Sequence, residues 1–227
     1  KNIKTDPENL GKTIGLNLKD KSDMVEEFNL VKGFLNLTIS NSFYVSFLNS
    51  IAKNKKYGHL KPNKNSKTII VEYSSPNTNK PLHLGHIRNN LLGYSVSKIL
   101  EANGNNVIKT QIINDRGIHI CKSMVAWKLF GKNSNPSDLN IKGDQFVGKF
   151  YVLYNEQYNN EVSKLVASGM SEIDAKNQAP IYLKAKELLK KWELNDRDTK
   201  KLWSKMNKWV YEGFEMTYKK LGVDFNT

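Results

Sequence analysis

A strand, a broken loop, a helix and a second strand follow one another between residues 69 and 113, and this order constrains the fold more than any other feature. Residues 69–73 open with an apolar β-branched run, which is typical of a buried strand. Pro76, Asn77 and Pro81 end that strand, and residues 86–102 then carry apolar side chains at helical spacing. A second strand is expected over 107–113. Two strands joined by a helix predict a parallel, right-handed βαβ crossover and therefore an α/β fold.

The loop between the first strand and the helix delivers two histidines, His83 and His86, to the helix start. Backbone N–H groups in a first helical turn lack partners, and together with the helix dipole they stabilise phosphate oxygens. The histidines add directed donors, and Gly85 between them has no Cβ, so we expect a nucleotide to approach the backbone there. Ligands of such sheets lie beyond the carboxyl ends of the strands, where we expect the histidines to meet Asn114 and Asp115. The pattern predicts a triphosphate site.

The sequence around these histidines resembles a known family. His83-Leu84-Gly85-His86 resembles the HIGH signature of class I aminoacyl-tRNA synthetases, and residues 72–77 (EYSSPN), followed by Lys80, resemble arginyl-tRNA synthetases in particular. Residues 111–117 (QIINDRG) and 143–149 (GDQFVGK) resemble the segments that follow in the bacterial type of that family, in the same order. The resemblance covers most of residues 25–227. A bare HxGH also occurs in other nucleotidylyltransferases, so another enzyme of that kind stays an alternative.

The resemblance implies an arginine–tRNA ligase, which activates arginine with ATP to arginyl-adenylate and transfers it to the 3′ end of tRNA(Arg) in protein biosynthesis. His83, His86 and Lys80 would be catalytic, and these three with Gly85 would bind ATP. Magnesium is expected to arrive with the ATP, held by phosphates and water. Lys80 stands three residues before His83, so a phosphate contact is expected, although a solvated loop lysine is the plainer interpretation.

The resemblance also implies an amino-acid pocket, with Glu72, Ser75, Asn77 and His86 binding arginine. A carboxylate such as that of Glu72 recognises an ammonium or guanidinium group. Two plainer interpretations stay open: Glu72 as a carboxylate at a strand edge, and Asn77 as a residue whose side chain shapes a turn.

The other histidines, His59 and His119, are interpreted as ordinary core or surface residues. The single cysteine, Cys121, is expected to be a small buried hydrophobe. No spacing of cysteines and histidines fits a zinc site, so no protein-bound metal is expected.

The chain is strongly basic, with 35 Lys and Arg against 22 Asp and Glu and a formal charge of +13. This excess favours a polyanionic partner such as nucleic acid. Nine basic residues between Lys184 and Lys208 are interleaved with Trp192 and Trp203. Solvated helix faces would explain the same composition, and both interpretations stay open. There is no long uncharged apolar run and no signal-peptide pattern at the start, so a soluble cytoplasmic protein is expected. We also expect a monomer.

The sequence also predicts two domains. Residues 1–60 are expected to form part of a small N-terminal α/β domain, which the resemblance identifies as tRNA-contacting. Residues 61–227 are expected to be the first portion of a class I catalytic domain, a partial HIGH-type Rossmann nucleotide-binding domain with a helical insertion at about 117–221. The expected secondary structure comprises a half-buried strand at 33–39, an amphipathic helix at 42–51, a linker at 57–67, and helices at 117–130, 145–168, 171–193 (broken or kinked at Pro180) and 197–221.

The second signature of the family, a KMSKS-type lysine loop, does not occur in this sequence, and neither does an anticodon-binding helical domain. We therefore expect a fragment lacking the C-terminal part of such an enzyme, which binds ATP weakly and does not charge tRNA by itself. A noncatalytic RNA-binding paralogue is a further alternative, although such a protein tends to lose the two histidines.

Overall fold

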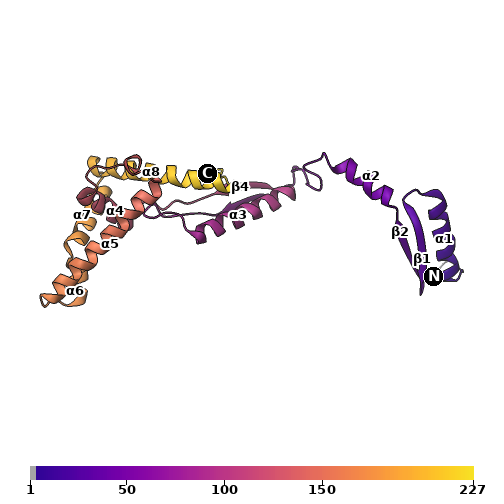
Figure 1. Ribbon diagram of the computed structural model, residues 1–227, viewed down its shortest axis with the longest axis horizontal. Coiled ribbons are helices and arrows are strands. Elements are labelled where there is room, and N and C mark those ends of the chain that lie inside the picture. Colours follow the sequence, from indigo (N-terminus) through magenta and orange to yellow (C-terminus); the bar gives the residue numbers. More distant parts are fainter. Residues whose placement is uncertain (1–3) are drawn as a thin grey trace. The chain divides into compact units, whose positions relative to one another are not determined.

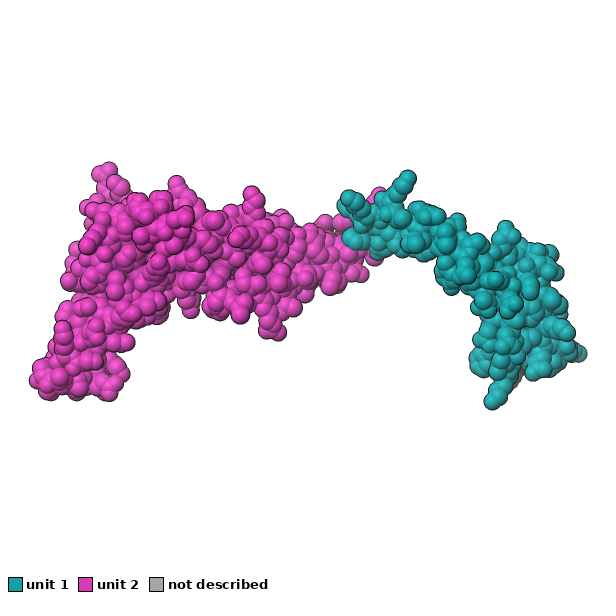
Figure 2. Space-filling view, viewed as in Figure 1, with its two compact units in different colours: residues 1–59 teal, residues 60–227 magenta. Residues whose placement is uncertain are grey.

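The computed structural model describes residues 4–227, which fall into two compact units divided between His59 and Leu60 (Figure 2). Residues 1–3, which belong to the predicted 1–60 domain and to the start inspected for a signal peptide, lie outside the described residues. Within residues 4–227, no helix combines the length and the apolar character needed to cross a membrane.

The smaller unit contains a helix, an antiparallel hairpin and a second helix. These are α1 (Pro7–Lys21), β1 (Val25–Val31), β2 (Phe34–Ile39) and α2 (Asn41–Ile51) (Figure 1). Lys32 and Gly33 connect the strands with φ of 49° and 82°, as a tight hairpin turn requires. β2 agrees with the strand predicted at 33–39. Its expected half-burial holds only for Leu35 and Ile39, which are partly buried, because Phe34 is 74% exposed. β1 was not predicted, because Glu26 and Glu27 interrupt its alternation where the pairing register shifts.

The larger unit begins with the predicted βαβ crossover. β3 (Thr68–Glu72) and β4 (Asn106–Thr110) pair in parallel, and α3 (Leu84–Ala102) connects them. The prediction that the first strand is buried was wrong, because Ile70 is 67% exposed. Successive strand residues face opposite sides of a sheet, and here only the side of Ile69 and Val71 is partly covered.

Five helices follow β4 and form the core of this unit: α4 (Ile118–Phe130), α5 (Gly143–Ala167), α6 (Glu172–Gln178), α7 (Pro180–Glu193) and α8 (Arg197–Leu221), with a 3₁₀ turn at Pro136–Leu139. Pro180 breaks the predicted 171–193 helix into α6 and α7, as expected. Phe146, Tyr154 and Val210 are fully buried among these helices. Cys121 is 2% exposed, which confirms the interpretation as a buried hydrophobe, and burial raises the pKa of its thiol to about 11.

The chain returns from α8 to the free edge of β4. Gly222 ends α8 with φ of 68°, a conformation that glycine adopts without strain. The Asn226 N–H then donates to the Lys109 carbonyl at 2.7 Å, and the Gln111 N–H donates to the Thr227 carbonyl at 3.1 Å. The bundle is thereby attached to the sheet at the same end as the loop that carries the histidines.

Candidate functional site

The chain turns sharply where β3 ends. Ser74 and Ser75 both have left-handed backbone angles, with φ of 71° and 44°, and neither is a glycine. The Ser75 N–H donates to the Tyr73 carbonyl at 3.1 Å, so Ser74 is the centre of a three-residue turn. Such backbone conformations cost on the order of 1–3 kcal/mol per residue and persist only where surrounding contacts hold them. The strain lies beside the residues expected to bind the amino acid.

The turn brings two predicted arginine ligands together. The Ser75 hydroxyl donates to the Glu72 Oε1 at 2.7 Å and accepts the Ile112 N–H at 3.1 Å. Both residues retain contact with solvent. A fixed carboxylate with a serine oxygen beside it is a suitable acceptor pair for an ammonium or guanidinium group.

Asn77 lies directly against the segment after β4. Its Oδ1 accepts the Asn114 Nδ2–H at 2.7 Å, and the two residues form a parallel bridge flanked by backbone hydrogen bonds from Asn114 to Pro76 and from Thr78 to Asn114. This supports the interpretation that Asn77 shapes the turn, because its side-chain oxygen already accepts a hydrogen bond from Asn114. Its amide N–H groups are the ones that a ligand would use.

The two histidines cap the start of α3 with their own rings. The Gly85 N–H donates to Nδ1 of His83 at 3.1 Å, and the His83 N–H donates to Nδ1 of His86 at 3.2 Å. A backbone N–H can only donate, so each Nδ1 must be an acceptor, which places the ring proton of each histidine on Nε2. The ring centroids are 4.0 Å apart. The pair thus offers two Nε2–H donors close together at a helix N-terminus.

The electrostatics of the site agree with a neutral imidazole at His86. Burial lowers the pKa of His86 from its ordinary value of 6.5, and the nearby His83 and Lys80 lower it further. Protonating His86 would also destroy the acceptor that its Nδ1 offers to the His83 N–H. His86 is consequently a neutral donor at pH 7, with Lys80 supplying positive charge beside it.

Gly85 lies directly against the ring of His83. A Cβ at this position would lie 2.9 Å from Cε1 of His83. The glycine therefore leaves room for the His83 ring to fold back onto the helix start. The close approach of a nucleotide at Gly85 stays a prediction. A side chain at residue 85 would displace His83 first.

The loop at Lys80 and Pro81 packs against α5. A Cβ on Gly148 would lie 2.7 Å from Cδ of Pro81, so the loop rests on the helix where the helix has no side chain. Lys80 is exposed, and its charge also lowers the pKa of His119, after desolvation and Lys122. An open hollow of about 530 Å³ lies between Pro81 and the outer face of α5.

The segment after β4 was expected to meet the histidines with Asn114 and Asp115. Asn114 reaches the loop at Asn77, but the Asp115 carboxylate is held by α8, where the Tyr211 hydroxyl donates to Oδ2 at 2.6 Å. The Trp203 Nε1–H donates to the Asp115 carbonyl at 2.6 Å. Asp115 is thus an anchor to the bundle.

The tryptophans interleaved with basic residues pack within the protein. The Lys200 Nζ lies 3.0 Å from the ring centroid of Trp192, and the Arg116 guanidinium lies 5.0 Å from it. Lys200 also lies 5.5 Å from the Trp203 ring. Cation–π contacts explain this interleaving without a nucleic-acid base stacked on the rings.

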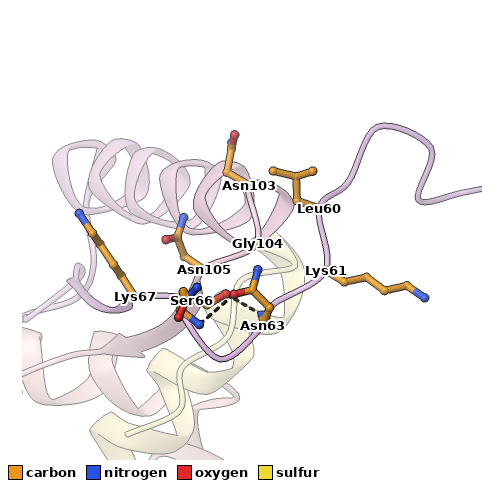
Figure 3. A pocket seen from close by; sticks show the side chains of 9 residues that line it. Leu60, Lys61, Asn63, Ser66, Lys67, Asn103, Gly104 and Asn105 are labelled. Atoms are coloured by element: carbon orange, nitrogen blue, oxygen red, sulfur yellow. Dashed lines mark hydrogen bonds between the residues drawn. The ribbon is translucent and has the colours of Figure 1, made fainter.

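A second open hollow, of about 480 Å³, lies at the other end of the sheet (Figure 3). It is lined by the segment before β3 and by residues 103–105 after α3. Its asparagines bond within the protein: the Asn63 N–H donates to the Ser66 hydroxyl at 2.7 Å, and the side-chain amides of Asn103 and Asn105 donate to carbonyls of α3. This is the amino end of the strands, whereas ligands of parallel sheets lie at the carboxyl end. We therefore assign the candidate site to the histidine loop.

Comparison with known proteins shows the family to which the chain belongs. The family described as tRNA synthetases class I (R), catalytic domain, matches residues 47–226. Arginine–tRNA ligase of Flavobacterium psychrophilum is 51% identical over 99% of this chain, and that of Parabacteroides distasonis is 49% identical over 98% of it. The chain spans 37% of the length of each of these relatives. Among solved structures, Thermus thermophilus arginyl-tRNA synthetase matches 95% of the chain and 31% of its own with a TM-score of 0.57 at 23% identity, which supports the fold.

Proposed function

The chain belongs to the catalytic-domain family of the class I (R) tRNA synthetases, and we propose that it contributes the ATP- and arginine-binding residues of an arginine–tRNA ligase. The observation that carries the proposal is the pair of imidazoles at the start of α3, each of which accepts a backbone N–H at Nδ1 and so leaves Nε2 free to donate. The parallel βαβ unit would be the first part of a HIGH-type Rossmann domain. The whole reaction takes place in translation, with tRNA(Arg) as the acceptor.

The proposed first step joins arginine to AMP. An oxygen of the arginine carboxylate attacks the α-phosphorus of ATP, a new P–O bond forms, and the bond to the bridging oxygen breaks as pyrophosphate leaves. Negative charge grows on the phosphoryl oxygens in the transition state. The Nε2–H groups of His83 and His86 donate to these oxygens, and one such donor is typically worth about 3 kcal/mol. The partial positive charge of the α3 N-terminus adds to their effect. Lys80 adds a positive charge beside His86.

Arginine would be recognised at the end of β3. Glu72 and Ser75, 2.7 Å apart between Oε1 and Oγ, supply a carboxylate and a hydroxyl for a cationic group of the substrate. Asn77 supplies amide N–H donors, and His86 faces both substrates in this proposal. The 2′ or 3′ hydroxyl of the terminal tRNA ribose then attacks the arginyl carbonyl, and AMP leaves.

Magnesium would enter with the ATP. Among residues 4–227 no group of three or more histidine, cysteine or acidic side chains is placed to hold a metal ion. An ion bound mainly by phosphate oxygens and water fits this site better than a protein cage.

Calorimetric titration with ATP tests the proposal. We expect His86→Ala to weaken ATP binding at least about tenfold, which corresponds to about 1.4 kcal/mol. His59→Ala, in the smaller unit, is the matched control and should leave the affinity unchanged. Binding of RNA without binding of ATP would instead support a noncatalytic RNA-binding protein, and equal ATP affinity of His86→Ala and wild type would refute the assignment of the site.

A further inference from the structure

A hydrogen-bonded network joins the far end of α8 to the turn after β3. The Ser74 hydroxyl and the Tyr218 hydroxyl are 2.7 Å apart, and the Tyr218 hydroxyl donates to Oε1 of Gln111 at 3.0 Å. Ser74 and Tyr218 are each only 4% exposed. Ser74 is therefore not available to a ligand, although it lies between predicted ligands.

The directions of these bonds follow from counting protons. A tyrosine hydroxyl has one proton, and the Tyr218 proton is committed to the Gln111 oxygen, which can only accept. The Ser74 hydroxyl must then donate to the Tyr218 oxygen. Burial is the main cause that raises the pKa of Tyr218, so this hydroxyl keeps its proton throughout the physiological range. The network has one arrangement, and it fixes the rotamer of Ser74.

The chain beyond α8 reinforces the same turn. The Tyr73 hydroxyl donates to the Asp224 carbonyl, and the ring centroids of Tyr73 and Phe225 are 4.6 Å apart. The Phe225 ring is also 5.0 Å from that of Tyr218. Tyr73 and Ser74 are thus held from α8 and from the segment after it, while the next residue, Ser75, reaches Glu72.

We propose that Tyr218 is a positioning residue of the amino-acid site: its hydroxyl holds Ser74 in the left-handed turn that presents Glu72 and Ser75 to arginine. The identity of the ligand, arginine, rests on the proposed function. The geometry of the turn rests on the observed hydrogen bonds. Two consecutive serines with positive φ need external support, and Tyr218 with Gln111 is the support that reaches Ser74. The helical region thereby controls amino-acid binding without touching the amino acid.

The claim that Tyr218 holds the turn is tested by amide hydrogen exchange in Tyr218→Phe, which keeps the ring and removes the hydroxyl. The Ile112 N–H donates to the Ser75 hydroxyl, so its protection reports whether the turn is in place. We expect its exchange to accelerate about three- to tenfold, the equivalent of one hydrogen bond. Tyr158→Phe is the matched control, because the Tyr158 hydroxyl donates to the Lys176 carbonyl far from the turn. Unchanged Ile112 exchange in Tyr218→Phe would overturn the proposal.

The claim that the turn controls arginine binding is tested by titrating arginine and ATP separately into the same variants. Tyr218→Phe should weaken arginine binding about three- to tenfold and leave ATP binding within about twofold, since the histidines do not depend on this turn. Adding Ser74→Gly should restore much of the arginine affinity, because glycine adopts a φ of 71° without needing a hydroxyl to hold it. Ser74→Ala in the same background should not.

The outcomes separate the two claims. If wild type binds no arginine, the proposed function fails, and the Ile112 exchange alone then decides whether Tyr218 holds the turn. If wild type binds arginine but Tyr218→Phe binds it equally well, or Ser74→Gly rescues no better than Ser74→Ala, the positioning role is wrong and the proposed function stands.

Discussion

The helical bundle α4–α8 and the loop between β3 and α3 are built on opposite principles. The bundle encloses large apolar side chains such as Phe146 and Tyr154, which have no exposed surface. The loop leaves Lys80 and His83 exposed, and the neighbouring Ile70 in β3 is 67% exposed. Packing stabilises the bundle, whereas the loop takes its shape from hydrogen bonds and from contacts with the bundle. The site therefore depends on the bundle for rigidity.

Three contacts transmit that rigidity. Pro81 rests against Gly148 of α5, Ser74 bonds to Tyr218 of α8, and the Asp115 carboxylate accepts the Tyr211 hydroxyl. Each reaches a different point of the loop or of the segment beside it. The comparison implies that core mutations act on stability, whereas mutations at the three contacts act on ligand binding.

The largest expected difference is between removing a buried ring from the bundle and removing an exposed apolar side chain from β3, beside the loop. Phe146→Ala should lower the free energy of unfolding by about 3–5 kcal/mol, because it removes a fully buried ring that packs on Phe150 and Trp209. Ile70→Ala in β3 should cost less than about 1 kcal/mol, because most of that side chain already faces solvent. Urea unfolding followed by circular dichroism measures both. Similar losses in the two variants would erase the contrast.

A smaller effect is expected where the loop meets α5. Gly148→Ala places a methyl group 2.7 Å from the Pro81 ring, so the loop must shift, and ATP affinity should fall about tenfold. Alanine favours a helix by about 1 kcal/mol over glycine, so a weakened α5 cannot be the cause. The control is Ser163→Ala, at an exposed position of the same helix. Wild-type ATP affinity in Gly148→Ala would show that the contact does not matter.

The smallest expected effect is a loss of folding stability at low pH. Desolvation is the first cause that lowers the pKa of both His86 and His119 from 6.5. Just below that value the unfolded chain binds more protons than the folded chain, so stability is complete above about pH 6.5 and falls as the pH drops through this window. Unfolding measured at pH 7.5 and 5.5 should show a smaller acid-induced loss in the double variant His86→Gln, His119→Gln than in wild type. Equal losses would remove the histidines from the explanation.

Local signals explain what could be predicted from the sequence. The helix starting at the histidines, the stop at Gly222 and the break at Pro180 depend on residues within one or two turns. The burial of β3 was predicted wrongly, because an apolar run such as that around Ile70 does not reveal how many layers cover it. The contact between the Gly85 position and the His83 ring could not be predicted either, since it depends on a side-chain rotamer.

Long-range contacts account for what the sequence could not show. Ser74 and Tyr218 are 144 residues apart, and neither carries a motif that would pair them. Asn114 was expected near the site, but its bond to Asn77 and the attachment of Asp115 to Tyr211 required the fold. Hydrogen bonds between side chains far apart in the sequence leave no periodic pattern from which they could be predicted.

The central claim is that His83 and His86 present Nε2–H donors to ATP, and nitrogen NMR of the imidazole side chains tests it most directly. At pH 7.5 we expect both rings in the Nε2–H form, because each Nδ1 accepts a backbone N–H. Addition of ATP should shift the Nε2 signals of both and leave His59 unchanged. A proton on Nδ1 of either ring, or ATP that moves neither signal, would contradict the account.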